Sequence, residues 1–95
     1  MDCRQIKYSA HALQQLFLRN ISTDDVEEVI RKGITVVEYA DDTPYPSFLL
    51  LGIIAGRPIH VVAASNDEGT CIIVTVYEPS LELWENDFRT RRRII

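Results

Sequence analysis

The spacing of apolar residues in this chain changes at Gly33, and this change constrains the fold more than any other feature. Before it, the residues from Ser22 onward predict a helix, because Ser22 and Asp25 have the spacing of a capping box. The apolar stripe of this helix consists of Val26, Val29 and Ile30. After Gly33, apolar runs separated by turn residues predict strands. We expect these strands at about residues 34–39, 47–54, 59–64 and 70–77.

An earlier helix is predicted to begin after Ser9, a favourable N-cap residue, and to end at Asn20. Its expected core-facing side carries apolar residues at helical spacing, namely Ala12, Leu13, Leu16 and Phe17. His11 and Gln15 then lie on the opposite side. Near the C-terminus, Leu81, Trp84 and Phe88 have roughly helical spacing and predict a short amphipathic turn.

These segments predict one α+β domain over residues 1–95, in which residues 88–95 form a basic tail. A chain of 95 residues is too short for two domains that each bury an adequate core. The predicted order is two N-terminal helices, a four-stranded antiparallel sheet and a short C-terminal helical turn.

Two of the predicted strands, 47–54 and 70–77, are apolar on both faces. An antiparallel sheet with one face in water normally alternates apolar and polar residues, and two short helices cover only one face. We therefore expect the second face to be covered by the segment 84–88, by a second copy of the chain or by another protein. We favour a partner, and a homodimer is included in that expectation.

The charge of the chain is unevenly distributed. The net charge is −4, but residues 1–88 hold six basic residues against fourteen acidic ones, a net of −8. The tail holds the remaining basic residues, which are Arg89, Arg91, Arg92 and Arg93. An acidic body argues against nonspecific binding of nucleic acid, which needs clustered lysine and arginine. The tail could contact phosphates or an acidic partner, or it could simply be a solvated end.

The two cysteines, Cys3 and Cys71, have neither the spacing nor the neighbouring histidines of a metal site. We expect both to be reduced thiols in a cytoplasmic protein. No apolar run approaches the ~18 residues that span a bilayer, so no membrane partner is expected. No cofactor or metal ion is expected either, because the chain has no phosphate-binding glycine loop and no paired metal-binding histidines.

Four residues could carry chemistry, and each has a structural alternative. His11 could be a general acid or base, or an ordinary surface histidine. His60 lies among valines and alanines, which is typical of a hydrogen-bonded core histidine. Tyr77 could donate a hydrogen bond or stack on a base, or it could pack across strands. Arg57 is expected to be exposed at a turn, where binding residues are common.

Several motifs follow the pattern of a bacterial family of unknown function, DUF 4258. They are Ser9-Ala10-His11-Ala12, Arg19-Asn20-Ile21-Ser22, Asp25-Val26, Gly33, Tyr45-Pro46-Ser47, Gly56-Arg57-Pro58-Ile59-His60-Val61-Val62 and Thr75-Val76-Tyr77-Glu78-Pro79. With Trp84 and the arginine tail, the resemblance covers nearly the whole chain. Two positions depart from the pattern, because Gln15 stands where the family often has an arginine and Asn20 where it has a glycine.

Members of that family resemble compact relatives of the RelE/BrnT-type toxins, small ribonucleases paired with an antitoxin. The resemblance implies a RelE-like fold and an RNA-binding, metal-independent endoribonuclease of the mRNA interferase type. It also implies a cognate antitoxin, in some cases a small zinc-finger protein of the MqsA kind, that covers the sheet.

The same resemblance suggests roles for individual residues. His11 or His60 would be the general base or acid, and Tyr77 would orient or stack the base. The phosphate would be held by cations drawn from Arg19, Arg57, Arg91, Arg92 and Arg93. The alternative is a non-catalytic interaction module, an inactive toxin relative that dimerises or binds a partner through its sheet. The acidic body and Gln15 favour this alternative.

Overall fold

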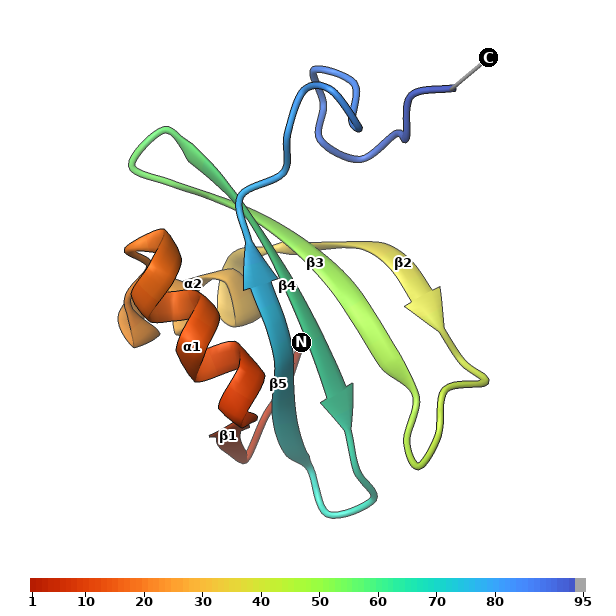
Figure 1. The fold of residues 1–95 in the computed structure, drawn as a ribbon. Coiled ribbons are helices and arrows are strands. Elements are labelled where there is room, and N and C mark those ends of the chain that lie inside the picture. The colour runs from red at the N-terminus through yellow and green to blue at the C-terminus, as the bar shows by residue number, and fades with distance from the viewer. Residues whose placement is uncertain (94–95) are drawn as a thin grey trace.

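The computed structural model describes residues 1–93, which form one sheet with two helices on one of its faces (Figure 1). The helices are α1 (Ala10–Arg19) and α2 (Thr23–Lys32). The strands are β1 (Gln5–Tyr8), β2 (Ile34–Tyr39), β3 (Ser47–Ile54), β4 (Arg57–Ser65) and β5 (Thr70–Tyr77). Four of these strands and both helices lie close to their predicted positions.

The predicted fold class is wrong in the composition of the sheet. The sheet has five strands in the order β1-β5-β4-β3-β2, and it is mixed because β1 pairs with β5 in parallel. A strand, and not a helix, therefore comes first in the chain. The sequence does carry a short signal for this strand, because the less polar Ile6 and Tyr8 alternate with the polar Gln5 and Lys7. In the structure Ile6 and Tyr8 are partly buried, and Gln5 and Lys7 are exposed. Four residues are too few for that alternation to stand out from coil.

The hydrophobic core lies between the helices and the sheet. α1 packs on β5, whereas α2 packs on β3 and β4. The buried residues of this core include Val26, Val29, Ile30, Leu50, Ile59, Val61, Ile73 and Val76. Gly52 allows α2 to approach β3 closely, because a Cβ atom at this position would lie 2.7 Å from Cγ2 of Val29. The predicted stripe of α2 is confirmed, since all three of its members are buried.

The predicted helix ends are confirmed by their hydrogen bonds. The Ser9 hydroxyl accepts from the Ala12 amide at 3.0 Å, and Asn20 ends α1 in the left-handed conformation with φ of 53°. Ser22 and Asp25 form the reciprocal bonds of the capping box, at 3.0 and 3.1 Å. These bonds are local, which is why the sequence predicts them well.

The predicted core-facing side of α1 is only half correct. Ala12 and Leu16 are buried, but Leu13 and Phe17 are 50% and 87% exposed. The helix is rotated so that Gln15, on the expected polar side, becomes partly buried. The reason is that α1 packs on β5 alone, beside a short edge strand, and this narrow contact covers only part of an apolar surface.

The expectation of two reduced thiols is also wrong, because Cys3 and Cys71 form a disulfide with Cα atoms 5.6 Å apart. Parallel pairing of β1 with β5 explains the contact. Gln5 pairs with Thr70 and Ile6 with Cys71, so the residues before β1 run beside the start of β5. The two cysteines are 68 positions apart, so local sequence patterns give no sign of this pairing. No helix within residues 1–93 has the length and apolar character needed to cross a membrane.

The C-terminal segment forms turns and no regular helix in the part that the structure describes. An isolated bridge pairs Trp84 with Arg91, so residues 80–91 fold back on themselves. The expected helical turn is therefore replaced by a compact loop beyond the end of β5 (Figure 1).

Candidate functional site

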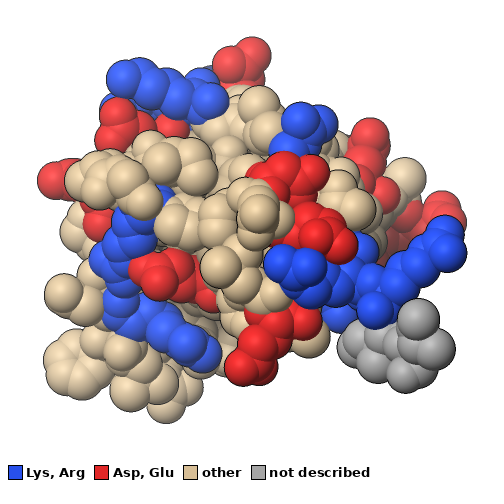
Figure 2. All heavy atoms as spheres, turned by 90° about the horizontal axis from the view of Figure 1, so that it is seen from above, with Lys and Arg blue, Asp and Glu red and all other residues tan. Residues whose placement is uncertain are grey.

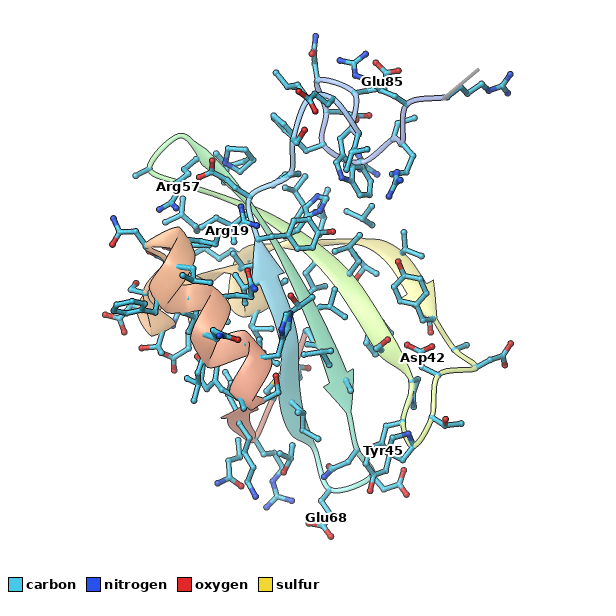
Figure 3. The ribbon with its side chains drawn as sticks, in the orientation of Figure 1. Arg19, Asp42, Tyr45, Arg57, Glu68 and Glu85 are labelled. Carbon is cyan, nitrogen blue, oxygen red and sulfur yellow. A yellow bond between two sulfur atoms is a disulfide. The ribbon has the colours of Figure 1, made fainter. Side chains whose placement is uncertain are left out.

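The sheet face opposite the helices carries a cluster of aromatic and basic side chains. His60 lies in the middle of the sheet and its neighbours Ile59 and Val61 belong to the helix-side core, so the alternation of β4 directs His60 to the other face. Tyr77 is its partner on β5. The Trp84 ring packs edge-on against His60, with ring centroids 4.6 Å apart and an interplanar angle of 89°. The C-terminal segment therefore covers one end of this face (Figure 3).

Both ring nitrogens of His60 are hydrogen-bonded. Nε2 lies 2.8 Å from the carbonyl oxygen of Phe88, and Nδ1 lies 3.1 Å from the hydroxyl of Tyr77. A carbonyl can only accept, so Nε2 carries the proton and donates it. In the neutral ring Nδ1 is then an acceptor, and the Tyr77 hydroxyl donates to it. Phe88 holds its carbonyl in place with an uncommon left-handed φ of 56°.

Burial lowers the pKa of His60 from its ordinary value of 6.5, and the hydrogen bond to the Phe88 carbonyl only partly opposes this effect. The side chain is 0% exposed, so the charged form has no access to water. His60 is consequently neutral at physiological pH, which is the state that its two hydrogen bonds require.

This lowered pKa predicts an acid-sensitive fold. The unfolded chain binds a proton at His60 near pH 6.5, whereas the folded chain binds it only at lower pH. The stabilising contribution is thus complete above pH 6.5 and is lost as the pH falls from there toward the folded pKa. We expect the free energy of unfolding, measured by urea titration at pH 7.5, 6.0 and 5.0, to fall more steeply in wild type than in His60→Gln. Equal slopes would contradict the assignment of a buried neutral His60.

Tyr77 connects His60 to the surface. Burial raises the pKa of Tyr77, the nearby Tyr39 adds to the rise, and the positive charge of Arg91 opposes it. Arg91 lies over the Trp84 ring, with its guanidinium carbon 5.2 Å from the centroid, a cation–π geometry. Tyr39 is 40% exposed at the end of β2. We call these residues the Tyr77 site: Tyr39, His60, Tyr77, Trp84 and Arg91.

Among the predicted site residues, the structure brings His60, Tyr77 and Arg91 together. His11 is not joined to them: its Nε2 lies 3.1 Å from the Thr75 hydroxyl at the junction of α1 and β5. The two histidines thus occupy separate places. His60 also matches the expectation of a hydrogen-bonded strand histidine, since its ring is buried and both nitrogens have partners.

The other predicted cations have structural partners. Arg57 donates to the carbonyl oxygens of Arg19 and Asn20, at 2.5 and 2.9 Å, and pairs with Glu78. It therefore caps the C-terminal end of α1 from the β3–β4 hairpin, and its side chain is only about one-third exposed. The expected exposure of Arg57 at the turn is therefore only partial, because the end of α1 lies against the hairpin.

Part of the arginine tail is held by hydrogen bonds and an ion pair within the C-terminal loop. Arg92 donates to the Leu81 carbonyl at 2.5 Å and pairs with Glu85 at 2.8 Å, which closes the C-terminal loop. Arg93 is exposed. Figure 2 shows basic side chains next to one another near this end, with acidic side chains beside them. A binding site here would depend on one or two arginines at defined places.

Tyr39 and Trp84 are the members of the site that sequence reasoning missed. The segment 84–88 was one of three possible covers for this face, and Trp84 does pack on it, but its contact with His60 depends on the loop through which residues 80–91 return. Tyr39 follows the alternation of β2, whose last pair is Tyr39 with Ser47 on β3. Its approach to Tyr77 depends on sheet twist and side-chain length, which no local pattern encodes.

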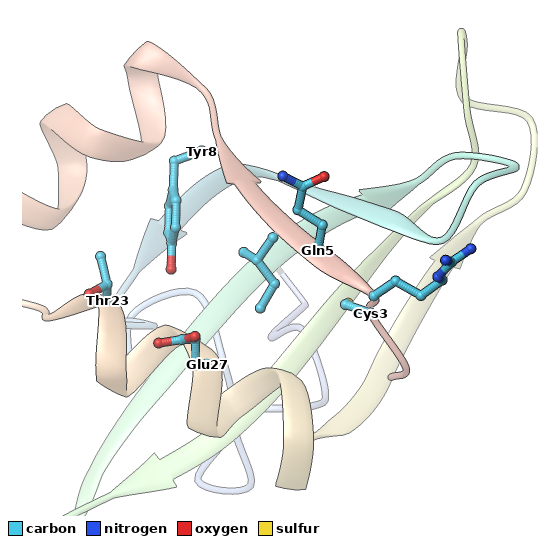
Figure 4. A pocket seen from close by; sticks show the side chains of 7 residues that line it. Cys3, Gln5, Tyr8, Thr23 and Glu27 are labelled. Atoms are coloured by element: carbon cyan, nitrogen blue, oxygen red, sulfur yellow. The ribbon is translucent and has the colours of Figure 1, made fainter.

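A hollow lies between β1 and α2, away from the sheet face that carries the Tyr77 site (Figure 4). Tyr8 points into it, between Thr23 and Glu27, and its buried hydroxyl has no hydrogen-bond partner in the described part of the chain. Burial raises the pKa of Tyr8, and the nearby Glu27 and Asp24 raise it further. The phenol is therefore protonated, and no base contacts it. Within residues 1–93, no group of three or more His, Cys, Asp or Glu side chains is placed to hold a metal ion.

The family model described as Domain of unknown function (DUF4258) matches residues 8–78, which span α1 through β5. The chain belongs to this family. No curated protein and no solved structure matches it significantly. The matched region of this DUF4258 chain contains Tyr39, His60 and Tyr77, whereas Trp84 and Arg91 lie beyond its end.

The Tyr77 site of the DUF4258 chain combines three chemical capacities. The phenol of Tyr77 can exchange a proton, because His60 Nδ1 is an acceptor aligned with its hydroxyl. Arg91 supplies a fixed positive charge close to that phenol. Trp84 adds aromatic surface beside His60, and Tyr39 lies further along the same sheet face, where it pairs with Ser47. Together these groups suit an anionic substrate that carries planar rings.

Proposed function

We propose that this chain is a toxin-like, metal-independent endoribonuclease that cleaves RNA at the Tyr77 site. The observation that supports the proposal is the hydrogen-bonded pair of Tyr77 and His60, with the second nitrogen of His60 fixed by the Phe88 carbonyl. This arrangement positions one phenol, on a sheet face, beside one guanidinium. RNA supplies both the phosphate that the guanidinium binds and the bases that aromatic rings stack on.

The proposed reaction is an attack of the ribose 2′-oxygen on the adjacent phosphorus. The Tyr77 oxygen accepts the proton of the 2′-hydroxyl while its own proton moves to His60 Nδ1. The 2′-oxygen then bonds to phosphorus, the bond from phosphorus to the 5′-oxygen breaks, and solvent protonates the departing oxygen. His60 returns its extra proton to Tyr77, which releases one to solvent, so both groups regain their starting states. The products carry a 2′,3′-cyclic phosphate and a 5′-hydroxyl. His60 is buried and acts through Tyr77, so it is a positioning and proton-accepting residue.

Arg91 would stabilise the charge that develops on the phosphate oxygens during this attack. Because it is held over Trp84, its guanidinium is oriented before the substrate binds. Trp84 is itself 96% covered, so a base would stack on the exposed ring of Tyr39, further along the same sheet face. In this proposal His11, Arg19, Arg57 and Arg92 do not contact the substrate, because their functional atoms already have partners in the fold.

A ribonuclease of this kind needs an inhibitor in the cell that makes it. The proposal therefore includes an antitoxin-like partner, which could be of the zinc-finger type, and it places the protein in the cytoplasm, where its RNA substrate is found. Because the body is acidic, its long-range attraction for RNA is weak. Binding of the RNA substrate must therefore come from short-range contacts at the Tyr77 site.

The test is incubation of the purified protein with a 5′-labelled single-stranded RNA in EDTA, beside the same oligonucleotide with 2′-deoxyribose. We expect cleavage of the RNA alone, with products that end in a 2′,3′-cyclic phosphate. The test variant is Arg91→Gln, which keeps a polar side chain but removes the charge, and it should slow cleavage by about 10²-fold. Intact RNA with folded wild-type protein would refute the ribonuclease and favour the non-catalytic interaction module.

A further inference from the structure

α1 presents a row of large apolar side chains to solvent. Leu13 and Phe17, one turn apart, are 50% and 87% exposed, and Leu18 beside Phe17 is 65% exposed. We call these three residues the α1 ridge. An exposed leucine by itself needs no explanation, but three such side chains on one ten-residue helix form a contiguous apolar surface.

The ridge borders a shallow hollow at the junction of the two helices. Leu13 and Phe17 form one side, Ile21 lies at the turn, and Thr23 and Asp25 at the start of α2 form the other side. Asp24, next to Asp25, is exposed. The hollow therefore has an apolar side, and Asp25 on its other side shares the first turn of α2 with the exposed Asp24.

We propose that the α1 ridge and this hollow bind an amphipathic helix of a partner protein, with basic residues beside its apolar stripe. Recognition of a helix in a groove uses a few apolar anchors at one-turn spacing, and Leu13 and Phe17 provide matching partners on this chain. Lysine or arginine on the incoming helix would meet Asp24 and Asp25, and the complementary charges would set its orientation.

A second copy of this chain fits the surface less well. A stable symmetric dimer buries about 800 Å² on each partner, whereas α1 is about 15 Å long and offers three exposed apolar side chains. Two copies would also bring together bodies that each carry a net charge of −8 over residues 1–88. Mutual repulsion opposes that approach, and the same charge attracts a basic helix.

This inference does not depend on the proposed ribonuclease. The α1 ridge lies on the helix side of the sheet, and the Tyr77 site lies on the opposite face. A partner docked at α1 would leave Tyr77 uncovered, so the two surfaces can be tested separately.

The test uses a fluorescein-labelled 18-residue helical peptide with leucines on one face and lysines on both flanks of that face. Fluorescence anisotropy should show saturable binding to the full chain, with amide shifts in NMR spectra confined to α1 and the start of α2. Phe17→Ser should weaken binding at least tenfold, since it removes the most exposed side chain of the ridge. Asp24→Asn should weaken it about threefold, and less at high salt.

Two controls make the result decisive. Leu81→Ser removes another exposed apolar side chain (52%, close to the 50% of Leu13) away from α1 and should leave binding unchanged. A peptide with glutamates in place of the lysines should bind at least tenfold more weakly. Equal binding of both peptides, or no effect of Phe17→Ser, would overturn the proposal. A dimer in analytical ultracentrifugation that Phe17→Ser dissociates would assign the ridge to a second copy and overturn it too.

Discussion

Replacing Tyr77 by phenylalanine should reduce the rate of RNA cleavage by about 10²- to 10⁴-fold, the usual contribution of a general acid or base. The substitution keeps the ring that packs against His60, with centroids 5.2 Å apart, and removes only the hydroxyl that donates to Nδ1. Cleavage rates at saturating RNA, measured by gel quantification of a labelled substrate, give the effect directly.

The loss of that hydroxyl also leaves a buried nitrogen of His60 without a partner, which costs about 1–3 kcal/mol of stability. Thermal unfolding must therefore accompany the rate measurement, so that a folded fraction can be assigned. Tyr45→Phe is the matched control, because it removes a phenol from the β2–β3 loop at the other end of the same sheet face. A full cleavage rate in Tyr77→Phe would show that the phenol takes no part in catalysis.

Replacing Trp84 by alanine should lower the free energy of unfolding by about 3–5 kcal/mol, as is typical of buried tryptophans. Trp84 is only 4% exposed, it packs on His60, and it supports Arg91. Such a loss is large beside the ~5–15 kcal/mol that stabilises a domain in total. Urea unfolding followed by far-UV circular dichroism measures it.

The same variant tests the arrangement of the C-terminal segment. Without Trp84, water reaches His60, and the pKa of that residue should rise toward 6.5 in an NMR titration. Leu83→Ala is the control, because Leu83 is 43% exposed and its truncation should change stability by about 0.5 kcal/mol or less. If Trp84→Ala were as stable as Leu83→Ala, the loop would not be packed on the sheet.

Local signals predicted the secondary structure from Ser9 to Tyr77. The caps at Ser9 and Ser22, the stripe of α2 and the ends of β3 and β5 all depend on residues within a few positions of one another. The pairing of His60 with Tyr77 was also accessible in part, because alternation along β4 and β5 directs each side chain to a definite face.

Other features could not be read from the chain. β1 pairs with a strand about 65 positions away, and that pairing alone explains both the fifth strand and the disulfide. The rotation of α1, which exposes Phe17, follows from how much surface β5 offers to the helix. Arg57 was a candidate phosphate ligand until the hairpin placed it against the end of α1.

The sequence by itself therefore determined the helices, four of the strands and the family of this protein, because capping, alternation and turn chemistry act over three or four residues. The tertiary structure decided which cations are held by partners in the fold, which apolar surfaces stay exposed and how Trp84 and Arg91 come to lie near His60 and Tyr77. Those outcomes depend on contacts between segments that are far apart in the chain. Their free energies arise only when the sheet brings these segments together.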